Sequence, residues 1–323
     1  MFKQNTFFRE RPLFDAFEQQ SAQNWLPLEI TQLSAGAYQG QLREIQHNDV
    51  SVCFEQQNCM VHKRGIMVDP YCTVSFTRRT NAKARISEYD SQNDFLFFIP
   101  SGYELDVQVG KDVETVYFRF NQAQFLERAR VISPLNWSED PNELLIFNSS
   151  LRKQLEVFSQ YIYSQQSFQF GLKIVEKNQI LGSLIMDKVI LALDTPFINN
   201  DRYSHLITFR RAKERVSQAL EYIDHVLING VCPSIVDICI GINVSQRNLQ
   251  YSFKKVLGLT PNAYLYYLRL NRARVQLSTV NKNAVTVTQV AMNWQFWHLG
   301  RFAHDYLQLF GELPSTTLLR SMS

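Results

Sequence analysis

Two stretches in the last hundred residues repeat one pattern, and this repeat constrains the fold of the 323-residue chain more than any other feature. Each stretch begins with a short apolar segment, continues through a tight turn, and ends in a longer segment with apolar residues at every third or fourth position. That spacing forms one buried face of a helix. The first stretch spans about 235–256 and the second about 287–310. The chain therefore carries two predicted helix-turn-helix units in tandem.

The first unit predicts a second helix with one buried and one exposed face. Ser245 stands directly before this helix, where an N-cap is expected, and Asn243 occupies the turn, where a left-handed backbone is usual. The buried face consists of Leu249, Phe253, Val256 and Leu257. The exposed face carries Arg247, Gln250, Tyr251, Lys254 and Lys255. A helix that enters the DNA major groove needs this arrangement, because its buried side fixes its angle and its polar side chains reach the base edges.

The second unit repeats the apolar spacing with a less polar outward face. Phe296, Tyr306 and Phe310 are the expected anchors, and Thr286 caps the helix before the turn. Gln295 stands at a turn position that usually takes Gly, at a cost of ~1 kcal/mol. The outward positions are Leu299, Gly300, Ala303 and His304. They offer few hydrogen bonds to bases, although Leu and Ala contact a thymine methyl group well. We expect the first unit to discriminate between sequences and the second to contribute position and shape.

The exposed residues of the first unit divide by their chemistry. Arg247 suits a bidentate contact to guanine and Gln250 one to adenine, each contributing ~1 to 3 kcal/mol of discrimination. Tyr251, Lys254 and Lys255 suit contacts to phosphates. Two plainer interpretations stand beside these: the lysines form a merely solvated helix face, and the unit is an ordinary helical hairpin.

The segment between the units predicts one long helix. Pro261 suits its first turn, and an apolar stripe continues to Leu277. These seventeen residues, at a rise of 1.5 Å each, span roughly 25 Å, which sets the two units about one DNA turn apart. Arg269, Arg272 and Arg274 lie on or near this helix, and we expect some of them to be packed or ion-paired rather than bound to phosphate.

Charge divides the chain at about residue 205. Residues 205–323 hold thirteen Lys and Arg against six Asp and Glu, a net charge of +7. The full chain holds 33 and 30, so twenty and twenty-four remain before residue 205, a net charge of −4. A basic domain behind a mildly acidic one indicates a DNA-binding module joined to a module of another kind.

Two further stretches of the C-terminal region are distinctive, Val256-Leu257-Gly258-Leu259-Thr260-Pro261-Asn262-Ala263-Tyr264-Leu265 and Leu309-Phe310-Gly311-Glu312-Leu313-Pro314-Ser315. With them, the segment from about Ala212 to Met322 resembles the DNA-binding domain of the AraC/XylS family of bacterial transcription regulators. The string Phe296-Trp297-His298-Leu299-Gly300 is similar to the subgroup of ethanolamine-utilisation operon regulators. The family usually has Gly where Asn243 and Gln295 stand, and more polar residues where Leu299 and Gly300 stand.

The resemblance implies partners and a sensor. It implies promoter DNA and RNA polymerase as partners, with the residues named above in both units as the contacts to DNA. It also implies an N-terminal sensor that is often cupin-like, with a helical part that carries homodimer contacts in many relatives. If the subgroup resemblance extends to the effector, it implies ethanolamine, with a cobalamin acting jointly.

The front of the chain predicts a small antiparallel barrel or sandwich over about 26–120. Gly, Pro, Asn and Asp separate short strand-like segments at roughly ten-residue spacing. The expected strands are 29–33, 39–45, 50–55, 65–68, 73–77, 84–89, 95–99, 103–109 and 114–120. From 121 to about 195 the periodicity becomes helical. The predicted fold class is α+β: a cupin-like antiparallel β-barrel with a helical extension in domain 1–204, and in domain 205–323 an all-α pair of helix-turn-helix units joined by a long helix.

The predicted barrel is a candidate effector-binding site. Its aromatic residues line a pocket or simply fill the core: Phe54, Tyr71, Phe76, Tyr89, Phe95, Phe97, Phe98, Tyr103, Tyr117, Phe118 and Phe120. Weak candidates for polar contacts to a ligand are His62, Arg64, Asp69, Arg78 and Glu88.

An enzyme is disfavoured. A cupin metal site needs two or three His and a Glu, whereas the front domain has only His47 and His62, without a His-x-His element. His298 and His304 have no Cys or carboxylate at ligand spacing. No Gly-x-Ser-x-Gly elbow, phosphate-binding loop or dinucleotide fingerprint occurs. We expect no catalytic residue, no metal and no required cofactor.

The cysteines and the apolar runs indicate a cytoplasmic protein. Cys53, Cys59, Cys72, Cys232 and Cys239 fall at no metal-like spacing, which favours reduced thiols. The first residues lack a signal-peptide core, and no run of about eighteen apolar residues occurs. We therefore expect neither secretion nor a membrane span.

The expected function is that of a sequence-specific, effector-responsive activator of a catabolic operon, with an ethanolamine-like small molecule as effector. One alternative is a regulator of the same family that responds to an unrelated, hydrophobic effector. A repressor or nucleoid-type protein with little sequence preference is another, and a cupin-type enzyme is the most distant.

Overall fold

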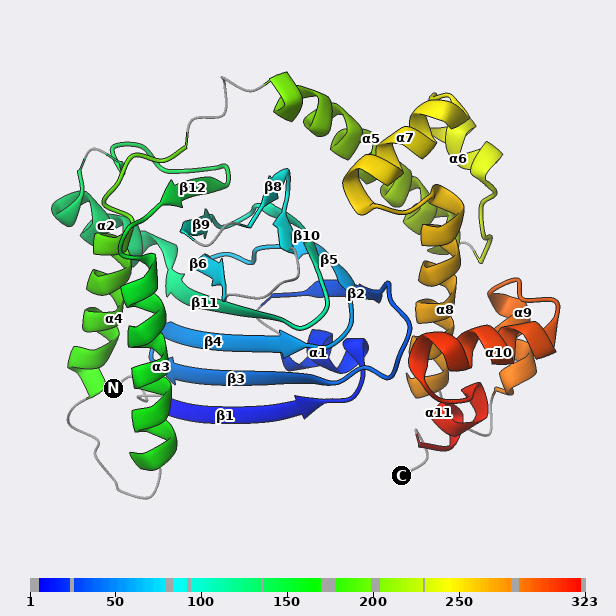
Figure 1. Ribbon diagram of the computed structural model, residues 1–323, viewed down its shortest axis with the longest axis horizontal. Coiled ribbons are helices and arrows are strands. Elements are labelled where there is room, and N and C mark those ends of the chain that lie inside the picture. The colour runs from blue at the N-terminus through cyan, green and yellow to red at the C-terminus, as the bar shows by residue number, and fades with distance from the viewer. Residues whose placement is uncertain are drawn as a thin grey trace.

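The computed structural model describes residues 6–23, 26–78, 84–91, 94–134, 136–169, 178–198, 204–228, 230–279 and 285–320. Strands dominate the N-terminal half and helices the C-terminal part, so the fold class is α+β, as predicted. Figure 1 shows the strands in the middle, with one group of helices on one side and the C-terminal helices on the other. No helix among the described residues is both long enough and apolar enough to cross a membrane.

The strands form two antiparallel sheets. The larger sheet has seven strands in the order β1 (Thr6–Leu13), β3 (Gly40–His47), β4 (Val50–Gln57), β11 (Val113–Asn121), β6 (Tyr71–Thr77), β9 (Phe95–Ile99) and β12 (Leu145–Asn148). The smaller sheet has five, in the order β2 (Leu28–Gln32), β5 (Val61–Ile66), β10 (Glu104–Val109), β7 (Ala84–Ile86) and β8 (Tyr89–Asp90). Because side chains alternate along a strand, each sheet presents one face to the other sheet and one face outward.

The inner faces of the sheets share one core. Val61 and Leu105 of the five-stranded sheet are buried in the same cluster as Phe97 of the seven-stranded sheet. The short helix α1 (Ala16–Ala22) adds Ala16 to this cluster.

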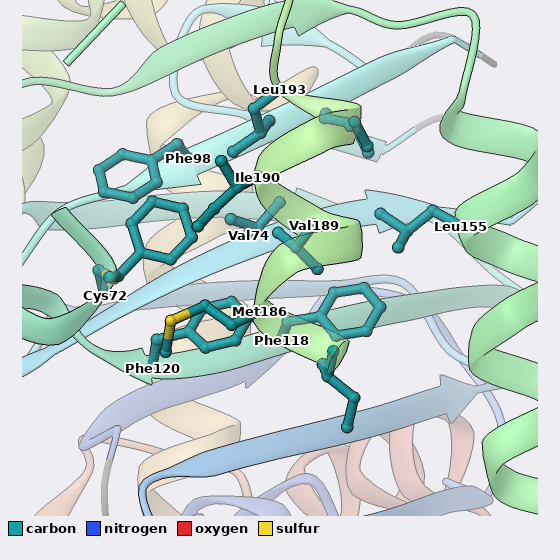
Figure 2. Packing of buried hydrophobic residues seen from close by; sticks show 14 of the residues in the cluster. Cys72, Val74, Phe98, Phe118, Phe120, Leu155, Met186, Val189, Ile190 and Leu193 are labelled. Atoms are coloured by element: carbon teal, nitrogen blue, oxygen red, sulfur yellow. The ribbon is translucent and has the colours of Figure 1, made fainter. Parts of the chain in front are cut away.

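Three helices cover the outer face of the seven-stranded sheet. They are α2 (Gln122–Ile132), α3 (Arg152–Gln169) and α4 (Asn178–Ala192). Figure 2 shows Met186, Val189 and Ile190 of α4 among Val74 and Phe118 of the sheet. Five aromatic residues considered for a pocket belong to this outer core instead, namely Phe54, Phe76, Phe98, Phe118 and Phe120. Fully burying each such side chain contributes roughly 1.5–3 kcal/mol, so their role is to hold the helices on the sheet.

The C-terminal domain consists of helices. In chain order they are α5 (Ser204–Ile228), α6 (Ile235–Gly241), α7 (Gln246–Leu257), α8 (Pro261–Thr279), α9 (Val287–Asn293), α10 (Leu299–Phe310) and α11 (Pro314–Arg320). Helices α6 and α7 form the first helix-turn-helix unit, α9 and α10 form the second, and α8 is the long connecting helix, as predicted. The units have separate cores, and α8 contributes Leu268 to the first and Leu277 to the second.

The sheets depart from the predicted strands at three places. Strand β5 covers Val61–Ile66, whereas 65–68 was expected, because the consecutive polar residues His62, Lys63 and Arg64 obscure it. Strands β1 and β12 lie outside the expected range 26–120, and β12 interrupts a region expected to be helical. The polar residues His62, Lys63 and Arg64 of β5 have partners on another layer of the molecule, which a local pattern does not show.

Candidate nucleic-acid interface

Caps define the first helix-turn-helix unit. The hydroxyl of Ser234 accepts from the backbone N–H of Asp237 at 3.2 Å, and the Asp237 carboxylate accepts from the backbone N–H of Ser234 at 2.9 Å. These hydrogen bonds lower the pKa of the Asp237 carboxyl. Asn243 in the turn has a φ of +53°, the left-handed conformation predicted for it. The predicted N-cap Ser245 accepts from the N–H of Asn248 at 3.3 Å.

The second unit repeats these features. Thr286 and Gln289 form the same reciprocal cap, with a backbone N–H to hydroxyl distance of 3.2 Å. Gln295 has a φ of +59°, so a residue with a long side chain holds the left-handed turn position. The turn is one residue longer than in the first unit, and His298 precedes α10 without a side-chain cap. The duplication inferred from sequence thus extends to backbone conformation.

All nine predicted DNA contacts lie on the surfaces of α7 and α10. Arg247, Gln250, Tyr251, Lys254, Leu299, Gly300 and His304 are exposed, and Lys255 and Ala303 are half-buried. The ammonium group of Lys255 donates to the Tyr251 hydroxyl at 3.1 Å, so these two side chains form one polar patch. The four apolar residues expected on the opposite face of α7 are all buried.

Two exposed side chains near the start of α10 were not predicted as contacts. Trp297 is 68% exposed and directly precedes the N-cap residue. The Arg301 side chain is 78% exposed and lies 3.5 Å from Asp305, one turn along the helix. Arg301 supplies the hydrogen-bond donors that Leu299 and Gly300 lack. Its position in the first turn of the helix was the sequence signal that could have identified it.

The arginines of α8 have partners inside the protein. Arg269 donates to the backbone oxygens of Trp294 and Gln295 and thereby supports the second turn. Arg272 lies 2.6 Å from a carboxylate oxygen of Glu29. Arg274, also on this helix, forms ion pairs with Asp15 and Glu312. The expectation that some of these arginines are packed or ion-paired is confirmed.

A cavity of about 70 Å³ lies between the two sheets. Its walls are mostly apolar and include Leu28, Ile86, Ile99, Leu105 and Val107. It also contains a buried ion pair between Lys63 and Glu55. The Tyr117 hydroxyl lies 3.5 Å from Glu55 and accepts a hydrogen bond from Gln23. Burial and the neighbouring Glu55 raise the pKa of Tyr117. The cavity thus offers an apolar space with one charged pair at its wall.

The five-stranded sheet uses both of its faces. Leu28, Lys63, Ile86 and Val107 face the cavity. The residues that alternate with them along the same strands contact the C-terminal domain, and they include His62, Arg64, Arg85 and Gln108. This sheet is therefore the layer shared by the cavity and the helix-turn-helix units.

None of the five polar candidates for ligand contacts lines this cavity. Three of them join the two domains instead. The His62 ring lies 2.8 Å from the Tyr264 hydroxyl, Arg64 donates to Asp224 at 2.9 Å, and Glu88 accepts from Arg210 at 2.9 Å. Asp69 accepts from Ser101, and Arg78 pairs with Glu114 and Glu156. Strand alternation turns His62 and Arg64 away from the cavity that Lys63 faces.

The described residues contain no group of three or more His, Cys, Asp or Glu side chains that could hold a metal ion. Of the histidines considered as metal ligands from the sequence, His62 is hydrogen-bonded to both Tyr264 and Asp106, and His304 is exposed on α10.

Residues 238–320 match the family described as a helix-turn-helix domain. The "XylDLEGF operon transcriptional activator 1" of Pseudomonas putida is 44% identical over 77 residues, which cover 24% of this chain and 23% of that protein. The "Probable thc operon regulatory protein" of Rhodococcus erythropolis is 38% identical over 85 residues, 26% of each chain. The chain thus spans about a quarter of the length of these curated relatives.

Among solved structures, the AraC-like transcriptional activator CuxR aligns over 84% of this chain and 96% of its own, with 16% identity and a TM-score of 0.42. An AraC-type regulator from Chromobacterium violaceum aligns over 35% of this chain and 96% of its own, with 25% identity and a TM-score of 0.31. Both curated relatives are named as regulators of an operon rather than as enzymes. Over residues 238–320 the C-terminal part of the chain matches a helix-turn-helix domain and is similar to the corresponding part of these operon regulators.

Proposed function

We propose that the protein is a sequence-specific DNA-binding regulator that activates transcription of a catabolic operon in response to a small molecule. The observation that carries this proposal is the pair of exposed helices, α7 and α10, at the two ends of one connecting helix. Each has a buried face that fixes its angle and a surface that can enter a major groove. The operon regulators that share this domain support activation as the outcome of binding.

The two helices have different roles in this proposal. Arg247 and Gln250 on α7 contact base edges, and Tyr251, Lys254 and Lys255 contact phosphates. Leu299, Gly300, Ala303 and His304 on α10 give a close fit to the groove, to which Arg301 adds hydrogen-bond donors. A nucleoid-type protein with little sequence preference fits less well, because the exposed side chains Arg247 and Gln250 are of types that hydrogen-bond to base edges.

The same role as a regulator implies two further partners, RNA polymerase and a second copy of the chain. Promoter-bound protein recruits RNA polymerase in the cytoplasm. Three exposed apolar side chains on α3 and α4, Val157, Tyr161 and Leu184, support a homodimer contact at these helices, being 63%, 60% and 41% exposed.

The cavity between the sheets is our proposed effector site. Its volume of about 70 Å³ is roughly half that of an apolar cavity that binds benzene, so it suits a molecule of a few non-hydrogen atoms. The Lys63–Glu55 pair suits a polar head, with Glu55 accepting from an ammonium group and Lys63 donating to a hydroxyl. An ethanolamine-like molecule has this chemistry, and cobalamin is far too large for this cavity. The mainly apolar walls also suit a small hydrophobic effector, which is the alternative.

The DNA-binding proposal is tested with two single substitutions. Duplexes bound by the wild-type chain are first selected from a random library. Arg247→Ala is expected to relax preference at one base pair by ~1–3 kcal/mol. Lys254→Ala is expected to weaken binding to all sequences equally and to reduce the slope of log affinity against log salt by about one. Equal losses on selected and random DNA for both variants would contradict the assignments.

A further inference from the structure

The two helix-turn-helix units have little contact with each other besides α8. Their cores are separate clusters, so each unit is packed independently around its own end of the connecting helix. The N-terminal domain touches both units. It contributes Leu33 to the core of the first, and its Asp15 pairs with Arg274 beside Tyr306 and Phe310 of the second. It is therefore a second bridge between them.

The N-terminal domain binds the C-terminal end of α7. A helix leaves its last four backbone carbonyls without partners inside the helix. In α7 the N–H of Gly258 donates to one of them, that of Lys254. Arg85 of β7 donates to the carbonyls of Lys255 and Val256 at 3.3 and 2.7 Å, and Gln108 of β10 donates to that of Leu257 at 2.9 Å. A guanidinium at this end also interacts favourably with the helix dipole.

The same domain binds the C-terminal end of α10. The side-chain amide of Gln32 donates to the carbonyl of Leu309 at 2.7 Å. The N–H of Gly36 donates to the carbonyls of Gln308 and Leu309 at 3.2 and 3.1 Å. The two helices proposed to contact DNA are thus held at their C-terminal ends by one body. The contact residues near their N-terminal ends are left exposed.

We propose, on the basis of the function proposed above, that Arg85, Gln108 and Gln32 are positioning residues that fix the spacing at which the protein binds two half-sites on DNA. α8 alone joins the units through one helix, whereas the N-terminal domain holds each of the helices α7 and α10 directly. Changing the DNA spacer by one base pair moves a half-site by about 3.4 Å and rotates it by about a tenth of a turn, which a rigid pair of units does not follow. A helix-turn-helix unit released from the N-terminal domain can shift to reach the displaced half-site more easily.

The test compares spacings on DNA. The wild-type full chain, Arg85→Ala/Gln108→Ala and Gln32→Ala each select duplexes from the same random library, and affinities are then measured on sites lengthened or shortened by one base pair. The wild type is expected to select one spacing and to lose about tenfold in affinity on the altered ones, the effect of losing one good base contact. Both variants are expected to select the same half-sites at several spacings and to lose less than about threefold.

The matched control is Arg128→Ala, which removes an exposed arginine paired with Asp187 on the far side of the N-terminal domain. It should keep the wild-type spacing. Circular dichroism and the thermal midpoint show that each variant is folded, and Gln32→Ala tests the second unit if Arg85→Ala/Gln108→Ala does not fold. Variants that keep the single wild-type spacing overturn the positioning role. A wild-type chain that enriches no sequence overturns the proposed function itself.

Discussion

Asn243 and Gln295 hold the two turns in the left-handed conformation without glycine. This conformation costs a residue with a Cβ atom roughly 1–2 kcal/mol, and Asn tolerates it better because its short side chain can bond locally. Gln295 has no such advantage. Its backbone carbonyl accepts from Arg269, which supports the turn from outside. The second turn therefore holds the residue that tolerates this conformation less well.

Replacing Gln295 with Gly should raise the stability of the chain. The expected gain is about 0.5–1 kcal/mol, because the relieved strain exceeds the extra freedom that Gly gives the unfolded chain. Asn243→Gly should give a smaller change or none. The measurement is the midpoint of thermal unfolding of the full chain for each variant. A larger gain from Asn243→Gly than from Gln295→Gly would show that strain at these turns is assigned to the wrong unit.

Local features of this kind could be predicted from the sequence. The caps Ser245 and Thr286 and the turn residue Asn243 act on neighbours within a few positions, so their pattern is visible in a short window. The roles of His62 and Arg64 could not be predicted, because their partners Tyr264 and Asp224 are 202 and 160 residues away.

At the scale of helices, α7 and α10 end in the same way. Each has a glycine in the left-handed conformation as C-cap, Gly258 with φ +70° and Gly311 with φ +73°. Their surroundings differ. A Cβ atom on Gly258 would meet nothing within 4 Å, whereas one on Gly311 would lie 2.8 Å from the Cβ and 2.9 Å from the backbone nitrogen of Ala37. Gly311 thus permits the close approach of the loop that caps α10.

Comparing Gly258→Ala with Gly311→Ala separates the cost of the left-handed backbone conformation from the cost of displacing the loop at Ala37. Gly258→Ala should cost only the left-handed conformation, about 1 kcal/mol. Gly311→Ala should cost that amount and also displace the loop at Ala37, so it should be the more destabilising and should broaden the tolerated DNA spacing as Gln32→Ala does. Thermal midpoints and affinities on sites of altered spacing are measured for both. Equal effects on both measurements would argue against a tight contact at Ala37.

At the scale of the molecule, the helices α2–α4, the seven-stranded sheet, the five-stranded sheet and the C-terminal domain form successive layers (Figure 1). The sequence predicted the two end layers well because helical periodicity and charge mark them. It predicted the sheets less completely, since His62, Lys63 and Arg64 of β5 pair with other layers and β1 and β12 lie outside the range of predicted strands. The location of the cavity depends on which strands face each other, and no single strand shows that.

A ligand in the cavity should change both the thermal stability of the chain and its affinity for DNA. Ethanolamine and 1-propanol have similar sizes, but only ethanolamine carries an ammonium group for Glu55. Ethanolamine is expected to raise the thermal midpoint, since a ligand at 100 times its Kd stabilises by about 2.7 kcal/mol, and to change DNA affinity. Lys63→Met/Glu55→Gln, which removes both charges together, should abolish both effects. A response to 1-propanol alone would favour the hydrophobic effector.

The alternation along the five-stranded sheet has a consequence for how such a protein can diverge. Position 63 borders the cavity and positions 62 and 64 border the C-terminal domain, and the same rule separates position 107 from 108 and position 86 from 85. On the proposal that this cavity is the effector site, a substitution at the cavity positions alters which molecule is accepted and leaves the positions that contact the C-terminal domain intact. Descendants of one ancestor can therefore acquire new effectors while inheriting an unchanged arrangement of the helices that meet DNA.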